Sequence, residues 1–285
     1  MMDFVWFCAS GDSFFLGTGL VVLVALVSMG KRRWTRALVI AMSTAGLSLI
    51  VLAAMPFHSV FYAILVIGTG FLIVCRGAAK WATRLRHAGQ IAILVLCTLG
   101  PLSEWKFLAG VGHPRGEPLY VIGDSVSAGI QGPNEATWPR LLAQEHAVEV
   151  VNLAESGATV ATAIKQARQV SDGPGLVFLE IGGNDLFAPT PPAQFREGLV
   201  HLLGQVVRPG RTVVMLEIPV LPWQMQYGRI QRQVARSHGV TLVPKRFFAS
   251  VLRHKGATLD LAHLSGEGHR KMANTVAALL GLNPG

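Results

Sequence analysis

The chain has 285 residues, of which 51% are hydrophobic and only 14% are charged, and its formal net charge is +9. Soluble domains carry about 25% charged residues, so the composition excludes intrinsic disorder and argues against a chain that is soluble throughout. No cysteine follows residue 97, which excludes a disulfide framework and a cysteine-based zinc site from the C-terminal two-thirds.

Positive charge is concentrated in the N-terminal part of the chain. Residues 1–106 hold nine Lys and Arg against three Asp and Glu, a net charge of +6 out of the total of +9. Eight of these nine cations form two clusters, which are Lys31, Arg32, Arg33 and Arg36, and Arg76, Lys80, Arg84 and Arg86. Clusters of this kind at the ends of apolar runs are typical of membrane proteins, and they argue against nucleic-acid binding.

Four apolar runs accompany the basic clusters, at residues 14–30, 37–57, 59–75 and 88–105. A helix needs about 20 apolar residues to cross a bilayer, within a range of about 17–25. The sequence therefore predicts an all-α transmembrane region of about four helices over residues 1–106. No basic segment precedes the first run, so we interpret it as a retained span and not as a cleaved signal peptide. The alternative is a set of helices buried in a large soluble core.

The basic clusters also predict an orientation. Cytoplasmic loops are enriched in Lys and Arg, which places both clusters in the cytoplasm. We therefore expect an integral plasma (inner) membrane protein with its N-terminus outside and everything after residue 106 extracytoplasmic, that is, periplasmic. The fourth apolar run is the weakest, because it is uninterrupted over only sixteen residues. If it does not cross, the rest of the chain lies in the cytoplasm.

Residues 107–118 are rich in Gly and Pro and predict a linker. Beyond it, short apolar runs alternate with amphipathic segments. We predict strands at residues 119–122, 148–151, 176–181, 212–218 and 240–243. We predict helices at residues 138–146, 159–170, 192–207, 226–237 and 266–280. This alternation predicts an α/β domain over residues 119–285, a three-layer, doubly wound fold with about five parallel strands.

Small and polar residues follow several of the predicted strands. In parallel sheets, reactive groups gather at the carboxyl ends of the strands. The segments at these ends are GDSVSAG at 123–129, NLAESGAT at 152–159, GGND at 182–185 and DLAHLS at 260–265. The loops that carry them are therefore where we expect the chemistry.

These segments contain the parts of a nucleophilic site. Ser125 opens a helix directly after a strand, so its hydroxyl can project from the sheet edge and its N–H lies at a helix N-terminus. Gly157 offers an unobstructed N–H and Asn184 a side-chain amide, and three such donors form an oxyanion hole. His263 can act as general base toward Ser125, and Asp260 can bind the other ring nitrogen.

Each segment alone has a structural alternative, because turns commonly use Gly, Asp, Ser and Asn. We expect Asp124 and Asp185 to bind loop backbone and Ser265 to cap the last helix. The spacing of Asp260 and His263 alone would also fit an N-cap and a surface histidine. The occurrence of all the parts at successive strand ends is what favours a catalytic site.

Together, GDSVSAG around Ser125, NLAESGAT around Gly157, IGGND around Asn184 and DLAHLSGEGH around His263 resemble the four sequence blocks of the SGNH hydrolases, the GDSL-type esterase and lipase superfamily. The resemblance covers the whole predicted α/β domain but not the N-terminal region. It implies a flavodoxin-like sheet, Ser125 as the nucleophile, Asp260 and His263 as the rest of a triad, and an oxyanion hole made by Ser125, Gly157 and Asn184. It implies no cofactor and no metal.

The expected reaction is hydrolysis of an ester through an acyl-enzyme. Placement beside a membrane suggests short-chain, O-acetyl esters of envelope carbohydrate as the substrate. The alternatives are a lysophospholipase or thioesterase acting on longer acyl chains, an acyltransferase that uses the same triad, and a catalytically silent binding module. The apolar loop at 219–225 either lines an acyl pocket or closes the domain, and we interpret Arg229, Arg232 and Arg236 as a solvated helix face.

Overall fold

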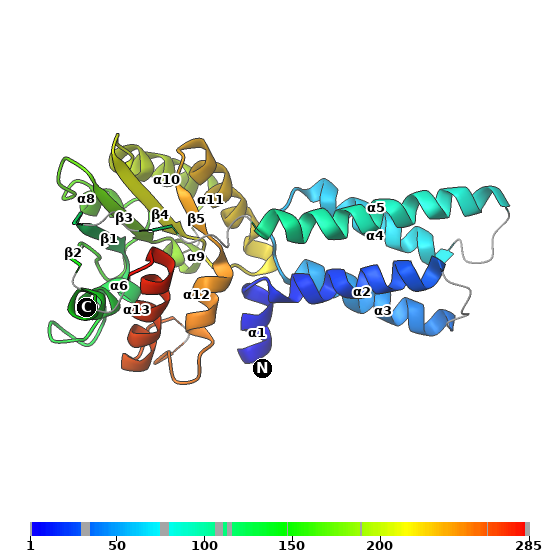
Figure 1. The fold of residues 1–285 in the computed structure, drawn as a ribbon, viewed down its shortest axis with the longest axis horizontal. Helices are drawn as coiled ribbons and strands as arrows, with labels where there is room; N and C mark the ends of the chain where they lie inside the picture. The colour runs from blue at the N-terminus through cyan, green and yellow to red at the C-terminus, as the bar shows by residue number, and fades with distance from the viewer. Residues whose placement is uncertain are drawn as a thin grey trace. The chain divides into compact units, whose positions relative to one another are not determined.

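The structure is a computed structural model, and it describes residues 2–29, 35–74, 80–105, 111–112, 116–146, 148–188, 190–260 and 262–282. The chain forms two compact units, an all-helical one at the N-terminal side and an α/β one at the C-terminal side (Figure 1). Each unit is described below by itself.

The N-terminal unit consists of the helices α1 (Met2–Ala9), α2 (Asp12–Met29), α3 (Arg36–Leu52), α4 (Ser59–Val74) and α5 (Lys80–Trp105). The four predicted helices correspond to α2 to α5, whereas the short α1 was not predicted. The core of the unit contains Phe14, Ile50, Met55, Leu65 and Ile93, which are at most 2% exposed. Each of α2 to α5 contributes to this core, so these four helices pack as a bundle.

Helices α2 and α3 approach closely at two glycines. A Cβ atom on Gly17 would lie 2.7 Å from the carbonyl oxygen of Gly46, and one on Gly46 would lie 2.9 Å from the side chain of Val21. Only residues without a side chain allow the two backbones to come this near. This contact explains why both glycines are accommodated in helix interiors, where glycine is otherwise unfavourable.

The helices can be compared with the length and hydropathy that a membrane span requires. Among the described residues, no single helix combines the necessary length with the necessary hydropathy. Helix segments Asp3–Ala9 and Asp12–Ser28 satisfy both criteria only when taken together, and they are bent by 77° at the break between them.

The α/β unit contains a single sheet with the strands β1 (Leu119–Gly123), β2 (Val150–Asn152), β3 (Gly175–Glu180), β4 (Arg211–Leu216) and β5 (Thr241–Val243). All neighbouring pairs are parallel, and the strand order is β2-β1-β3-β4-β5. The predicted strands are all present, with bounds that differ by at most two residues. Every residue of β1 and β3 is buried, as expected for central strands covered on both faces.

The helices of this unit are α6 (Ser125–Ala128), α7 (Trp138–Glu145), α8 (Ala163–Ala167), α9 (Gly183–Phe187), α10 (Pro192–Val206), α11 (Met225–Ser237), α12 (Lys245–Leu252) and α13 (Gly266–Leu280). A short 3₁₀ helix at Pro222–Gln224 precedes α11 in the chain. Helix α8 packs on α10, and α7 packs on α13. Figure 1 shows α10 and α11 on one side of the sheet and α12 and α13 on the other. The predicted three-layer arrangement of this unit is therefore confirmed.

One predicted helix is shorter than expected, and the helix α12 was missed. The helix expected over residues 159–170 is regular only in α8, because the Thr162 hydroxyl accepts the Thr159 N–H at 2.8 Å and holds a turn there. Helix α12 was not predicted at all. It follows Pro244 and buries Phe248 and Val251 against the core, a helical spacing that is too short to stand out from the sequence.

Candidate active site

The predicted nucleophile lies directly after the central strand β1. Ser125 is the first residue of α6, is 8% exposed, and follows Asp124, whose carboxylate accepts the Val126 N–H at 3.0 Å and caps the helix. The preceding Gly123 leaves no room for a side chain, because a Cβ atom there would lie 2.7 Å from the Ser127 hydroxyl. The local sequence thus forms a tight strand-to-helix turn with Ser125 at its apex.

The same segment contains a second serine, and its surroundings differ. Ser127 is fully buried, donates to Glu180 Oε2 at 2.9 Å and accepts from Trp138 Nε1 at 3.1 Å. Burial raises the pKa of the Glu180 carboxyl well above its ordinary value, and the negative charge of Asp124 adds to this effect. The Ser127 hydroxyl is therefore part of a buried structural network, which leaves Ser125 as the candidate nucleophile.

Asp260 and His263 are brought together by a compact turn. Asp260 Oδ2 lies 2.7 Å from His263 Nδ1, and Asp260 Oδ1 accepts the N–H groups of Ala262 and His263 at 2.8 and 2.9 Å. The hydrogen bond to the His263 ring, followed by these two N–H groups, holds the pKa of Asp260 well below its usual range. A carboxylate so placed fixes the ring so that Nε2 is the nitrogen available for proton transfer.

The base of this turn is closed by backbone pairing. Thr258 and Leu264 form an isolated antiparallel bridge, and the Leu259 N–H donates to the His263 carbonyl at 2.9 Å. Ser265 then caps α13 by accepting the Gly268 N–H, as predicted. The described residues 258–260 and 262–264 are not helical, but Asp260 and His263 make the expected contact between carboxylate and imidazole.

The two further oxyanion candidates lie at the ends of β2 and β3. Asn184 is in the first turn of α9, and its Nδ2 donates to the Ala158 carbonyl at 3.0 Å and to Asp124 Oδ2 at 3.3 Å. Gly157 has a φ of +78°, and no atom lies within 4 Å of where its Cβ would be. The loops after β1, β2 and β3 therefore meet at Asn184, with an unobstructed glycine beside it.

Two acidic residues support these loops. Asp185 is fully buried and its Oδ2 accepts the Val160 N–H at 2.9 Å, so it binds loop backbone as predicted. Asp124 binds backbone too, but it also contacts Asn184, which was not predicted. Burial raises the pKa of Asp124 to about 6, against the lowering effects of the Val126 N–H and of the His263 charge. The charge of His263 thus acts on Asp124, the residue that precedes Ser125.

A second carboxylate–histidine pair was not predicted from the sequence. His269 Nε2 lies 3.0 Å from Glu135 Oε1, and His269 Nδ1 accepts the Trp138 N–H at 3.2 Å. Glu135 also accepts the N–H groups of Ile130 and Gln131. Burial lowers the pKa of His269, although Glu135 acts in the opposite direction. This pair ties the start of α13 to the loop after α6, and its side chains are too deeply buried to meet a substrate.

The interpretation of the α11 arginines as a solvated face was wrong for Arg232. Its guanidinium binds the buried Glu217 through Nε at 2.6 Å and Nη2 at 3.1 Å, and Glu217 Oε2 also accepts the Lys245 N–H. Burial alone would raise the pKa of Glu217, but Arg232 outweighs it, so the pKa is lowered. Through these bonds, Glu217 connects the ends of β4 and β5 to Arg232 on α11 and to Lys245 on α12.

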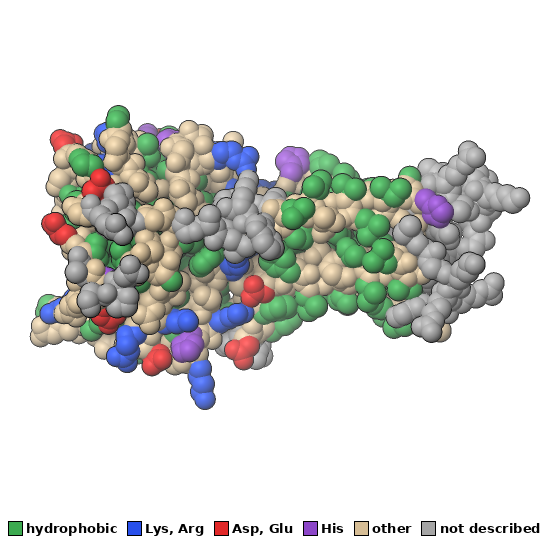
Figure 2. Space-filling model, viewed as in Figure 1, with side chains coloured by type: hydrophobic (Ala, Val, Ile, Leu, Met, Phe, Trp, Pro, Cys, Tyr) green, Lys and Arg blue, Asp and Glu red, His purple; other side chains and the backbone are tan. Residues whose placement is uncertain are grey.

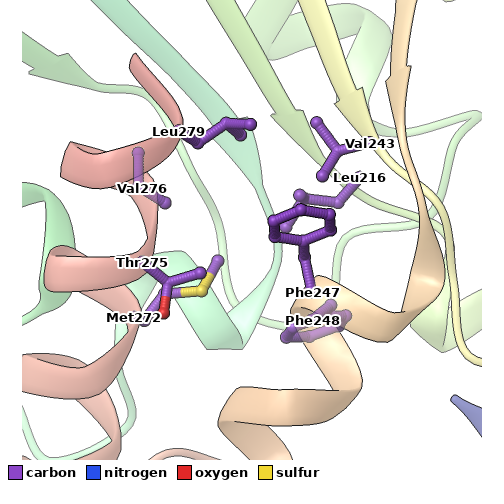
Figure 3. A pocket seen from close by; sticks show the side chains of 8 residues that line it. All are labelled: Leu216, Val243, Phe247, Phe248, Met272, Thr275, Val276 and Leu279. Carbon is purple, nitrogen blue, oxygen red and sulfur yellow. The ribbon is translucent and has the colours of Figure 1, made fainter. Parts of the chain in front are cut away.

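Figure 3 shows an apolar pocket in the α/β unit. Its lining residues come from β4, β5, α12 and α13 and are Leu216, Val243, Phe247, Phe248, Met272, Thr275, Val276 and Leu279. Its volume of about 10 Å³ has room for at most about one water molecule. None of the predicted site residues lines it, and neither does the loop at 219–225, so we interpret it as a packing gap in the core. Within the described ranges, no group of three His, Cys, Asp or Glu side chains is arranged to hold a metal ion.

Residues 121–271 match the model of the GDSL-like lipase/acylhydrolase family, which is more than half of the chain. The chain belongs to this family. Its α/β unit is therefore that of a serine ester hydrolase, and the resemblance inferred from the four sequence blocks is confirmed. The match begins inside β1 and does not include helices α1 to α5.

Two curated relatives are esterases. The chain is 35% identical over 130 residues to an arylesterase of Vibrio mimicus, covering 43% of this chain and 64% of that protein, slightly less than two thirds of its length. It is 31% identical over 140 residues to esterase TesA of Pseudomonas aeruginosa, covering 45% of this chain and 70% of that protein.

Solved structures share the same fold. A crystal structure of TesA superimposes with a TM-score of 0.51 at 26% identity and covers 57% of this chain and 98% of that one. Esterase EstA from Pseudoalteromonas sp. gives a TM-score of 0.52 at 18% identity, covering 58% and 97% of the two chains. The shared part is the α/β unit.

Proposed function

We propose that this family member is a membrane-anchored esterase in which Ser125 is the nucleophile, His263 the general base and Asp260 its orienting partner. The observation that carries the proposal is the hydrogen bond of 2.7 Å between Asp260 Oδ2 and His263 Nδ1. Ser125 Oγ attacks the ester carbonyl carbon while His263 Nε2 takes the hydroxyl proton.

The negative oxygen that forms is held by the N–H groups of Ser125 and Gly157 and by the Asn184 amide. Collapse of the tetrahedral adduct breaks the ester bond, and the alcohol leaves with the proton from His263. Water then attacks the acyl-enzyme with His263 again as base, which releases the carboxylic acid and restores the Ser125 hydroxyl. The Asn184 Nδ2, anchored between two loops, supports this role because a preorganised donor needs no reorientation during the reaction.

Two substrate classes follow from different observations. Short-chain, O-acetyl esters of envelope carbohydrate fit the extracytoplasmic placement that the basic clusters predict. Esters with longer or aromatic acyl groups are favoured by exposed apolar side chains on the loops that carry the site residues. Ile130 follows α6, Phe187 ends α9, and Leu259 precedes Asp260, and these three side chains are 45%, 71% and 53% exposed. Exposed apolar side chains on loops that carry site residues are a feature of ligand-binding surfaces.

The substrate class is tested with a series of p-nitrophenyl esters, from acetate through butyrate and octanoate to palmitate, on the full chain in detergent. Carbohydrate deacetylation predicts activity confined to the shortest esters. A maximum at octanoate or beyond contradicts that class and supports the apolar one. In the second case Phe187→Ser should lower the octanoate-to-acetate ratio, whereas Val200→Ser, at an exposed apolar position on α10, should not. Retention of activity in Ser125→Ala would contradict the proposed mechanism itself.

The membrane anchor is the second part of the proposal. Large apolar side chains are exposed on the helical unit, and Figure 2 displays hydrophobic groups over the outside of these helices. Of the 22 described large apolar side chains that are exposed, 17 belong to α1 to α5. Soluble surfaces rarely carry so much contiguous apolar area, so contact with lipid is the environment that suits these helices.

The orientation is tested with a reporter enzyme fused after residue 285 that is active only outside the cytoplasm. We expect an active reporter, because both basic clusters should remain in the cytoplasm. The matched fusion carries a reporter that is active only in the cytoplasm, and it should be silent. The opposite pair of results would place the catalytic unit in the cytoplasm and would favour acyl-thioesters as substrates.

A further inference from the structure

The Asn184 amide group uses both of its hydrogens in hydrogen bonds to the protein. One bond goes to the Ala158 carbonyl at 3.0 Å and the other to Asp124 Oδ2 at 3.3 Å. The amide therefore has a defined face, with Nδ2 toward the nucleophile loop and Oδ1 away from it. An asparagine that is free to rotate by 180° would present Oδ1 instead, and this atom repels an oxyanion.

We propose that Asp124 is a positioning residue for ester hydrolysis, and that its carboxylate fixes the Asn184 amide in the orientation that donates to the oxyanion. The inference rests on the proposed function, since it assigns a role relative to the Asn184 donor. Asp124 itself does not contact the substrate. Its 3.3 Å bond to Asn184 is long for a bond to a charged acceptor, so the same N–H can be shared with a developing oxyanion.

The burial of Asp124 restricts the partners of its Oδ2 atom, the oxygen that binds Asn184. Asp124 is 4% exposed, and its Oδ1 is occupied by the Val126 N–H. The charged and titratable groups that face it are Glu180 from β3, Asp185 from α9 and His263 from the loop before α13. Of these three, only His263 favours an ionised Asp124. Burial outweighs the lowering effects of the Val126 N–H and of His263, so the pKa of Asp124 is raised.

A buried carboxyl in this position gains a proton at a higher pH than usual. Burial raises the pKa of Asp124 to about 6, so the group is ionised at neutral pH and protonated under mildly acidic conditions. A protonated carboxyl is a weaker acceptor and can itself donate, so its hold on the Asn184 amide is lost. Activity should therefore fall on the acid side as Asp124 gains a proton.

Two variants separate positioning from helix capping. In Asp124→Asn, the new carbonyl can still accept the Val126 N–H, which turns the new amide NH₂ toward the NH₂ of Asn184. Two donors repel, so Asn184 turns over and presents its oxygen. In Asp124→Ser, the hydroxyl caps the helix as serine commonly does, but it is too short to reach Asn184. Both variants keep the cap and lose the acceptor.

The experiment measures kcat and KM for p-nitrophenyl butyrate in the full chain, with competent sites counted by a phosphonate that labels Ser125. We expect both variants to lower kcat by about tenfold or more, with an upper bound of about 10²–10³, the cost of losing one oxyanion donor. KM should change little. In an Asn184→Ala background, the substitutions at Asp124 should have no further effect, because the donor that they position is already absent.

The pH profile provides a readout that a purely structural role would not change. The acid limb of kcat should be steeper in the wild type than in Asp124→Asn, because the variant has one group fewer that must lose a proton. The inference is overturned if Asp124→Ser keeps wild-type kcat, if the losses at Asp124 and Asn184 add, or if the acid limb keeps its shape. An active Ser125→Ala would instead contradict the proposed function, so the two failures are distinguishable.

Discussion

Replacement of Ser125 by alanine should lower kcat for ester hydrolysis by about 10⁶-fold, the loss seen when a serine hydrolase loses its nucleophile. The reason is that the neighbouring hydroxyl of Ser127 cannot take its place. Ser127, the nearest serine in the sequence, is fully buried and bound to Glu180 and Trp138. The residual rate is measured by the release of p-nitrophenol from butyrate esters under single-turnover conditions.

The matched control is Ser127→Ala. This variant removes a buried hydroxyl, which leaves Trp138 Nε1 without its acceptor and Glu180 with one hydrogen bond fewer, so it should lower the free energy of unfolding by about 1–3 kcal/mol. The folded fraction should still react with a fluorophosphonate at Ser125. If the losses were reversed, with Ser127→Ala inactive and Ser125→Ala active, the nucleophile would have been misassigned.

Replacement of Asp260 by asparagine should lower kcat by about 10⁴-fold, with a small effect on KM. The carboxylate binds His263 Nδ1 at 2.7 Å and two backbone N–H groups, so asparagine preserves the shape of the turn. It cannot, however, stabilise the imidazolium that forms when His263 takes the Ser125 proton. The ring is then also free to adopt the wrong tautomer. Steady-state kinetics over a range of pH provide the test.

Glu135→Gln is the control for this experiment, because it alters a buried carboxylate–histidine pair of the same α/β unit. Glu135 binds His269 deep in the fold, where the pair braces the loop after α6. We expect a lower melting temperature and a rate far closer to the wild type than that of Asp260→Asn. A rate loss in Glu135→Gln as large as that in Asp260→Asn would mean that the local pairing of Asp260 and His263 is not what drives proton transfer.

The strands and the site loops were predictable because their signals are local. A central strand of a parallel sheet is a short, continuous apolar run, and β1 and β3 read in this way from the sequence. Asp260 and His263 are three residues apart, so a single turn brings them together. The loop motifs around Ser125, Gly157 and Asn184 are each contiguous, and the fold rule that gathers strand ends placed them at one edge.

The features that were missed depend on contacts between distant parts of the sequence. Glu135 and His269 are separated by 134 positions, and neither has a neighbour in the sequence that indicates pairing. The pairing of Glu217 with Arg232 is visible only when α11 folds back on β4. The bond from Asn184 to Asp124 spans 60 positions in the same way. Which side chains form such pairs is decided by tertiary packing, and local sequence patterns do not reveal it.

The closed loop that holds Asp260 and His263 has a consequence for how this site can be altered. The base and its orienting partner lie within four residues of each other, and the Thr258–Leu264 bridge closes the segment around them. The general base and the carboxylate that orients it therefore come from one short segment of the chain. If residues 258–264 were replaced by the matching segment of another family member, the base and its carboxylate would be exchanged together. Ser125, which lies more than 130 positions away in the sequence, would stay unchanged in such a chimaera.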